Sequence, residues 1–201
     1  HVIDRRDHIA GNAFSEPHAE TGIEIHRYGP HFFHTSNEEV WAYVNRFATF
    51  SPFELRVWSE HRGAMFPLPI NLATMSQFFG RRLTPSEAQA RELIASQSEG
   101  LDERAASSLE QKAIASVGRP LYEAFIRGYT QKQWQTDPAQ LPASIIGRLP
   151  VRFTFDTRYF SDRYQALPSE GYTGLVAAML GHPRISIGLN VDWREIRQSI
   201  P

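Results

Sequence analysis

The side chains best suited to ligand binding gather in one stretch of the chain, residues 128–164. Five aromatic rings alternate there with five cationic side chains: Tyr129, Trp134, Tyr159, Phe160 and Tyr164, with Lys132, Arg148, Arg152, Arg158 and Arg163. Aromatic faces stack on nucleotide bases, at roughly 1–3 kcal/mol per base, and guanidinium groups pair with phosphate oxygens. The mixture therefore suits a nucleotide that carries phosphates. An ordinary loop with solvated arginines explains the same composition about equally well.

Prolines divide this stretch and suggest where its central arginine lies. Residues 140–146 are bracketed by Pro138, Pro142 and Pro150. Proline interrupts regular helices and strands, so Arg148 is expected at the foot of a loop that can open and close.

The chain lacks the side-chain sets of self-sufficient catalysts. It has no cysteine, no GxSxG sequence and no P-loop. Asp156 and Asp162 both lie among arginines, and we expect them to orient those arginines rather than to form the carboxylate pair of a glycosidase. His26, His31 and His34 have no acidic cluster nearby and match no zinc spacing, so no metal site is predicted.

Composition limits the class of partner. The 201 residues include 41% hydrophobic and 21% charged side chains, which is typical of a globular chain. The formal net charge of −1 gives no global attraction to nucleic acid or to an anionic membrane. No apolar run approaches the roughly 20 residues of a membrane span. The absence of cysteine fits a cytoplasmic location.

Hydrophobic periodicity and capping signals predict a mixture of strands and helices. Strands are expected at 1–3, 23–28, 55–58, 64–69, 152–155 and 185–191, and helices at 40–48, 72–79, 109–117, 120–129 and 172–180. Capping boxes are expected at Ser36–Glu39, with Ser36 as N-cap, and at Thr84–Glu87, with Pro85 in the first helical position. The buried side of the helix that begins at Pro120 is expected to contain Leu121, Tyr122, Phe125, Ile126 and Tyr129.

Five long segments of the chain carry a family resemblance. They are RRDHIAGNAFSE, HRYGPHFFHTSNEEVW, QKAIASVGRPLYEAFIRGYT, TQKQWQTDPAQLP and GRLPVRFTFDTRYFSDRYQALPSEGYT. Together they closely resemble the bacterial UDP-galactopyranose mutases, and the similarity runs through essentially the whole chain. The resemblance implies an isomerase that interconverts UDP-galactopyranose and UDP-galactofuranose, with UDP-galactose as the small-molecule substrate.

The resemblance also implies that a cofactor does the covalent work. FAD in its reduced form would attack the anomeric carbon of galactose through N5 while UDP departs, and the sugar would then reclose before UDP returns. Arg148 matches the loop arginine that pairs with the diphosphate, as a catalytic residue. The uridine and diphosphate groove is matched by Tyr129, Thr130, Trp134, Tyr159 and Phe160.

The first residues resemble the adenosine end of an FAD site. Asp4 follows a short strand and matches the acidic residue that holds the cofactor ribose. Arg5, Gly11 and Asn12 are expected beside it, and His31 is implied to lie against the flavin ring as a second catalytic residue. Ala10 stands where relatives have glycine, and alanine costs about 1 kcal/mol or more if the backbone needs a positive φ there.

The implied fold class is α/β with an added helical part. It comprises a partial FAD/NAD(P)-binding Rossmann-like domain with adjoining strands at 1–69, a helical-bundle domain with a mobile substrate loop at 70–146, and part of an antiparallel sheet with a substrate region at 147–201. The chain contains no GxGxxG fingerprint. We therefore expect an internal fragment that binds FAD weakly or not at all and is inactive alone.

Two other functions stay open at this stage. An amine-oxidase-like, FAD-dependent oxidoreductase would share the cofactor domain but consume an electron acceptor at each turnover. A non-catalytic nucleotide-sugar-binding module would use the helices and the sheet to hold a ligand or a protein partner. Fold analogy does not choose among these functions, whereas the aromatic and arginine-rich stretch favours the mutase. A homodimer also stays open.

Overall fold

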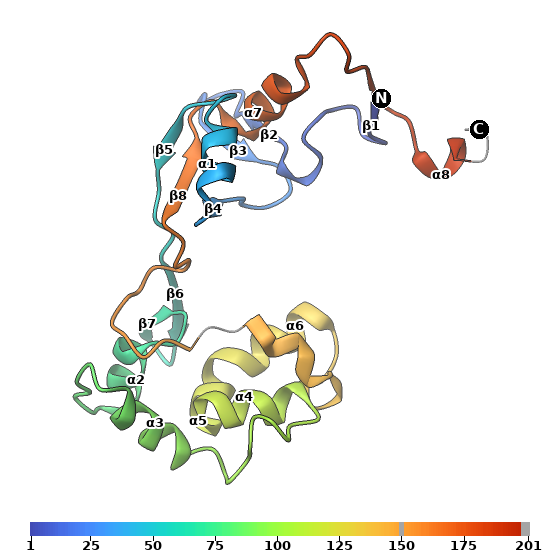
Figure 1. Cartoon of the computed structure of the whole chain (residues 1–201). Coiled ribbons are helices and arrows are strands. Elements are labelled where there is room, and N and C mark those ends of the chain that lie inside the picture. The colour runs from blue at the N-terminus through green and yellow to red at the C-terminus, as the bar shows by residue number, and fades with distance from the viewer. Residues whose placement is uncertain (149–150, 198–201) are drawn as a thin grey trace. The chain divides into compact units, whose positions relative to one another are not determined.

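The computed structural model describes residues 1–148 and 151–197, with the backbone alone at 147 and 148. It forms two compact units, one of residues 1–55 with 160–201 and one of residues 56–159 (Figure 1). These units divide the chain differently from the predicted ranges 1–69, 70–146 and 147–201. Those ranges remain a prediction about the parts of the implied family fold.

The unit that contains both ends of the chain is built on short strands. Its strands are β1 Val2–Ile3, β2 Ser15–Pro17, β3 Glu24–His26, β4 Phe33–Thr35, β5 Phe50–Pro52, β8 Tyr164–Pro168 and β9 Ile187–Gly188. β1 pairs in parallel with β9, and β2 pairs antiparallel with β3. β8 lies between β4 and β5, antiparallel to both. The predicted strands at 1–3, 23–28 and 185–191 therefore exist, but they are shorter.

Helices complete the described part of this unit. They are the 3₁₀ helix η1 Gly11–Ala13, α1 Glu38–Val44, α7 Gly171–Leu180 and α8 Trp193–Ile196. Of these, α1 and α7 pack against the strands of the unit. In Figure 1, α1 lies beside the sheet that contains β4 and β8. The hydrophobic residues buried in this unit include Val44, Ala166, Tyr172 and Leu175. The predicted helix at 172–180 is confirmed as α7.

The N-cap of α1 differs from the prediction. Asn37, not Ser36, caps the helix, because the Asn37 side chain accepts the backbone N–H groups of Glu39 and Val40 at 2.8 and 3.1 Å. The Ser36 hydroxyl instead donates to Asp162 Oδ1 at 3.0 Å. Asparagine and serine are equally good N-caps, so the tertiary contact of Ser36 decides between them.

The second unit combines a hairpin with helices. Its regular elements are β6 Val57–His61, β7 Ala64–Leu68, α2 Leu72–Phe79, α3 Glu87–Ala95, α4 Leu109–Val117, α5 Arg119–Leu121, the π-helix η2 Tyr122–Arg127, α6 Gly128–Trp134, and the 3₁₀ helices η3 Pro138–Gln140 and η4 Ala143–Arg148. Positive φ at Arg62 and Gly63 makes the two-residue hairpin turn. The hydrophobic core joins β7 to the helices through Phe66, Met75, Leu93, Ile114, Tyr122 and their neighbours. The predicted helices at 72–79 and 109–117 are confirmed.

The helix expected from Pro120 changes its winding. Leu121, Tyr122, Phe125 and Ile126 are buried as predicted, whereas the Tyr129 side chain is 70% exposed. The six residues of η2 form π-helix, with more residues per turn than an α-helix. This winding rotates the following residues relative to an α-helical register, so the prediction that Tyr129 is buried was wrong.

Two other local predictions were wrong. α3 begins at Glu87 after the N-cap Ser86, which makes no side-chain cap bond, so Pro85 lies outside the helix. Residues 152–155 form no strand. They are held instead by two backbone bonds to the start of α2, from Arg152 N–H to the Ile70 carbonyl and from Leu72 N–H to the Thr154 carbonyl.

The hydroxyl of Tyr122 provides a test of the core of the second unit. Tyr122→Phe is expected to raise the free energy of unfolding by about 1 kcal/mol, because this buried hydroxyl has no hydrogen-bond partner in the described part of the chain. Chemical denaturation followed by circular dichroism measures the change. Tyr43→Phe, at a ring on α1 that is 51% exposed, is the matched control and should shift the value by less than about 0.5 kcal/mol. A loss of stability in Tyr122→Phe would contradict the expectation.

Candidate functional site

The predicted cofactor residues at the start of the chain meet around Arg6. Asp4 directly follows β1, and its backbone is fixed by 3.0 Å hydrogen bonds to Gly188 and Val191. The Arg6 backbone N–H donates to Asp4 Oδ1 at 2.9 Å, and the Arg6 guanidinium lies 3.6 Å from the same oxygen. The guanidinium also donates to Asn12 Oδ1 at 2.6 Å. Arg6 therefore joins the strand end to the loop that carries Asn12.

The loop that brings Asn12 toward Asp4 contains two left-handed residues. Ala10 has a φ of 70° and Gly11 a φ of 55°. A Cβ on Gly11 would lie 3.9 Å from Asp4 Oδ2, which is an ordinary contact, so the demand for glycine at Gly11 comes from the backbone conformation. Ala10 also has the positive φ at which alanine is less favourable than glycine. Its left-handed backbone costs about 1–2 kcal/mol relative to an unstrained residue.

Sequence reasoning missed Arg6 and the ring on which it rests. The Arg6 guanidinium lies 5.0 Å from the centroid of Tyr28, whose hydroxyl is 2.7 Å from His8 Nε2. The predicted residue Arg5 is exposed, whereas Arg6 is half-buried. The available signal was the aspartate two residues before Arg6, because an aspartate side chain commonly accepts the N–H two residues further on.

His26 and His31 contact each other, whereas His34 pairs elsewhere. His31 N–H donates to His26 Nδ1 at 2.9 Å, and the two rings pack against Tyr172 of α7, with centroids 6.3 and 5.5 Å away. His34 Nδ1 lies 2.8 Å from Asp162 Oδ2. Across residues 1–148 and 151–197, no group of three or more histidine, cysteine or acidic residues is placed to hold a metal ion.

The two aspartates in the arginine-rich stretch have different roles. Asp156 binds the Arg158 guanidinium, with oxygen–nitrogen distances of 2.8 to 3.1 Å, and this hydrogen bonding lowers the pKa of Asp156 to about 2. Asp162 accepts from Ser36 and pairs with His34, and the bond to His34 is the main cause of its lowered pKa. The expectation that both orient arginines is confirmed for Asp156, whereas the side-chain bonds of Asp162 go to Ser36 and His34.

Two of the predicted substrate residues of the second unit, Tyr129 and Trp134, are exposed on α6. Tyr129 and Trp134 are 70% and 51% exposed, and Thr130 is buried at 6%. Tyr159 is 41% exposed at the end of the 151–159 segment. Arg148 ends η4, but its side chain lies outside the described residues. The rings are therefore accessible to a ligand, whereas the Thr130 side chain is not.

Other arginines of this stretch are already engaged. Arg152 donates to the backbone carbonyls of Arg158 and Tyr159. Arg163 belongs to the other unit, where it pairs with Glu38 and lies 5.1 Å from the centroid of the Tyr164 ring. The guanidinium groups of Arg152 and Arg163 therefore bind groups of the protein itself.

Phe160 also lies in the unit that contains the chain ends. Its ring stacks on His34, with centroids 3.7 Å apart and an angle of 13° between the planes. The predicted substrate set is thus divided between the two compact units, with Tyr129, Thr130, Trp134 and Tyr159 in one and Phe160 in the other.

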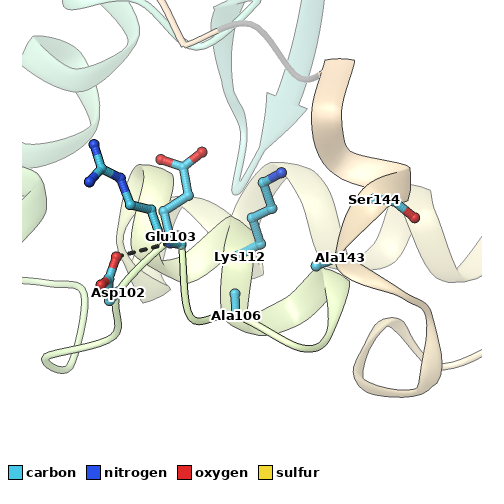
Figure 2. Close-up of a pocket in the computed structure, with 7 residues that line it drawn as sticks. Asp102, Glu103, Ala106, Lys112, Ala143 and Ser144 are labelled. Carbon is cyan, nitrogen blue, oxygen red and sulfur yellow. Dashed lines mark hydrogen bonds between the residues drawn. The ribbon is translucent and has the colours of Figure 1, made fainter.

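A surface depression that the sequence did not predict lies beside η4. It has a volume of about 590 Å³ and is lined by Asp102, Glu103, Arg104, Ala106, Lys112, Ala143 and Ser144 (Figure 2). In Figure 2 the side chains of Glu103 and Lys112 extend toward the same side of the loop. The lining mixes both signs of charge and contains none of the predicted site residues.

Ala10→Gly is expected to stabilise the chain by about 0.5–1 kcal/mol. Glycine relieves the left-handed strain, but it also increases the conformational entropy of the unfolded chain. Ala13→Gly, in the same loop but at a residue without positive φ, is the matched control and should destabilise. Thermal unfolding of both variants tests the prediction. Equal destabilisation by the two substitutions would contradict the strain at Ala10.

Asp156→Asn is expected to change how stability depends on pH. Because folding lowers the pKa of Asp156 from 3.8 to about 2, its ion pair stabilises the folded chain above about pH 4 and is lost as pH falls toward 2. The variant should therefore be less stable at neutral pH and lose less stability on acidification. Denaturation midpoints between pH 2 and 6 measure both effects. Asp7→Asn, at an exposed position, controls for the loss of one negative charge, and parallel pH profiles for wild type and Asp156→Asn would refute the prediction.

Two family models match separate parts of the chain. Residues 124–200 match the family model of UDP-galactopyranose mutase, and residues 1–47 match that of an NAD(P)-binding Rossmann-like domain. Throughout the part that the structure describes, no helix is long and apolar enough to cross a membrane.

Similarity to individual proteins covers nearly the whole chain. A probable UDP-galactopyranose mutase of Klebsiella pneumoniae is 45% identical over 198 residues, which are 96% of this chain and 49% of that protein. A dTDP-fucopyranose mutase of Escherichia coli is 44% identical over 188 residues, 94% of this chain and 49% of that protein. A UDP-galactopyranose mutase of Mycoplasma genitalium is 26% identical over 197 residues, 94% of this chain and 47% of that protein.

A solved structure supports the fold. A crystal structure of reduced UDP-galactopyranose mutase matches with a TM-score of 0.64 and 15% identity, covering 94% of this chain and 43% of that one. With the Rossmann-like match at residues 1–47, this likeness confirms the predicted mixed α/β fold class. The chain spans about half the length of the curated relatives it matches. Over nearly its whole length the chain is thus similar to UDP-galactopyranose mutases, as its sequence resemblance implied.

Proposed function

We propose that this chain contributes the sugar-nucleotide-binding helices and part of the cofactor-binding region of an enzyme that interconverts UDP-galactopyranose and UDP-galactofuranose. The observation that carries the proposal is the 45% identity to a probable UDP-galactopyranose mutase over 96% of the chain. The exposed rings of Tyr129 and Trp134 on α6 support it, because accessible aromatic faces can stack on a base.

The proposed role of Arg148 is electrostatic. A departing UDP gains negative charge on its diphosphate, and a guanidinium that pairs with two phosphate oxygens stabilises that charge. The backbone of η4 carries Arg148 at its last residue. Tyr129, Trp134 and Tyr159 would hold the uridine and so orient the sugar, which lowers the entropic part of the barrier.

FAD is the proposed cofactor, and the residues at the start of the chain are compatible with its ribose. Asp4 follows a parallel strand, and its Oδ2 takes no hydrogen bond from any described residue, so this oxygen can accept one from a ribose hydroxyl. Asn12 and Gly11 would approach the same group, and His31 would lie by the flavin. When bound and reduced, FAD supplies the nucleophile that this chain's own side chains lack. A homodimer and a cytoplasmic location remain predictions.

A second sugar nucleotide, dTDP-fucose, is also a candidate substrate. The dTDP-fucopyranose mutase is almost as similar to this chain as the probable UDP-galactopyranose mutase, at 44% against 45% identity. The two substrates differ at the pyrimidine methyl group, the ribose 2′-hydroxyl and the sugar 6-hydroxyl. The relatives' names favour an isomerase of either sugar nucleotide over an amine-oxidase-like oxidoreductase or a non-catalytic module.

Titration with UDP, followed by tryptophan fluorescence, tests nucleotide binding by this chain. Saturable quenching by UDP is expected, and Arg148→Ala should raise the Kd by about 10-fold or more, because charge-assisted hydrogen bonds contribute about 1.5–3 kcal/mol each. Arg81→Ala, at an exposed arginine after α2, is the matched control and should leave the Kd unchanged. Equal Kd values for wild type and Arg148→Ala would refute the proposed role of Arg148.

Parallel titrations separate the candidate substrates and functions. Tighter binding of UDP than of dTDP supports the galactose nucleotide, and the reverse order supports the fucose nucleotide. Incubation with reduced FAD and UDP-galactofuranose then tests turnover. We expect no conversion by this chain alone, whereas consumption of an electron acceptor would favour the oxidoreductase.

A further inference from the structure

The turn after β3 is closed by two hydrogen bonds that involve histidine rings. His31 N–H donates to His26 Nδ1 at 2.9 Å, and His31 Nδ1 lies 2.8 Å from the Gly29 carbonyl oxygen. Gly29 has a φ of 101°, which favours glycine and lets the chain reverse. His26 belongs to β3 and pairs with Ser15 of β2, so its ring is anchored to the sheet while His31 lies on the turn.

These bonds determine which ring nitrogens carry protons. A backbone N–H can only donate, so Nδ1 of His26 must hold a lone pair, and neutral His26 carries its proton on Nε2. A carbonyl oxygen can only accept, so Nδ1 of His31 must carry a proton. The closed turn is therefore compatible with neutral His26 and incompatible with doubly protonated His26, whatever the charge of His31.

The surroundings of His26 make its charge costly. The His26 ring meets the buried Tyr172 ring edge-on at 5.5 Å and lies 6.3 Å from the His31 ring. Burial raises the pKa of Tyr172 to about 12, so Tyr172 supplies no negative charge to balance an imidazolium. Glu24 on β3 offers an opposite charge. On the neighbouring strand, Glu16 is paired with Arg27 at 2.5 Å.

We propose that protonation of His26 at Nδ1 releases the turn at residues 29–31, so that the turn is closed at neutral pH and open in mild acid. The charged ring loses its only acceptor atom for His31 N–H. Protonation of both histidines also places two positive charges on rings 6.3 Å apart. Histidine is the side chain that titrates nearest to physiological pH, which suits it to such a switch.

The direction of the pH effect follows from the environment. Burial and the nearby His31 lower the pKa of His26 below its ordinary value of 6.5, and Glu24 opposes them. A histidine whose pKa is lowered by folding contributes stability that is complete above pH 6.5 and falls as pH drops through the lowered pKa. The turn is therefore expected to open below pH 6.5.

This switch goes beyond the proposed function and does not depend on it. If the proposed function holds, the same turn carries His31 toward the flavin, and acid would weaken cofactor binding by moving His31. If the proposed function fails, the turn still opens and closes with pH in this chain, and the two outcomes are measured separately.

Nuclear magnetic resonance of this chain tests the proposal directly. Nitrogen-15 spectra of the imidazole rings report which nitrogen of His26 is protonated, and hydrogen exchange reports how well His31 N–H is protected. We expect Nδ1 of His26 to be unprotonated at pH 7.5. As His26 titrates, the protection of His31 N–H, corrected for intrinsic exchange, should fall by about 2- to 10-fold, which corresponds to the loss of one ordinary hydrogen bond. A protonated Nδ1 at pH 7.5, or protection that stays constant through the titration, would overturn the proposal.

Two substitutions separate the charge of His26 from its role as acceptor. His26→Asn places an oxygen near the position of Nδ1 that accepts but does not titrate, so His31 N–H should stay protected across pH 5–7.5. His26→Leu removes the acceptor and should leave His31 N–H unprotected at every pH. His18→Asn, at an exposed histidine whose Nδ1 pairs with Thr21, is the control and should keep the wild-type transition. A wild-type transition in His26→Asn would show that another group is responsible and would contradict the proposal, and the wild-type titration decides the matter should either His26 variant fail to fold.

Discussion

The unit that contains both chain ends depends on the reciprocal bonding of Ser15 with the start of α7. The buried Ser15 hydroxyl accepts Tyr172 N–H at 2.9 Å, Ser15 N–H donates to Thr173 Oγ1 at 2.9 Å, and Thr173 Oγ1 donates to the Ser15 carbonyl at 2.6 Å. These bonds satisfy N–H groups that a helix N-terminus leaves open, across about 157 positions of sequence. Gly171 has a φ of 74°, and a Cβ there would overlap Glu24 and Ser15. The β2–β3 pair, with the turn that follows it, is thereby fixed to α7.

Elements with strong local signals could be predicted from the sequence. α2 and α4 end at glycines, and the hairpin of β6 and β7 turns at Gly63. Where two neighbouring residues were about equally good as N-cap, a tertiary contact decided which of them capped the helix. Asn37 caps α1 because Asp162, 126 positions away, engages Ser36. The exposure of Tyr129 could not be predicted from a helical period of 3.6, because the π-helix before it changes the register.

The candidate site, too, could be predicted from the sequence only in part. Asp4, Gly11 and Asn12 are close in sequence, so their grouping could be predicted, but the part played by Arg6 depends on the left-handed backbone at Ala10. The predicted substrate residues all lie within residues 129–160 but belong to both compact units. The function of Arg148 remains a prediction from the family resemblance.

Arginine content alone overstates the capacity of this chain to bind phosphate. Arg152 donates to two backbone carbonyls and Arg158 binds the Asp156 carboxylate. A diphosphate could recruit either guanidinium only by replacing those bonds, and removing a partner from a charge-assisted pair costs about 1.5–3 kcal/mol. Lys132 on the exposed side of α6 has no ion pair with any described residue. A cation without such a partner gains the full attraction of a phosphate, so the capacity to bind phosphate depends on uncommitted cations rather than on the total of 21 lysines and arginines.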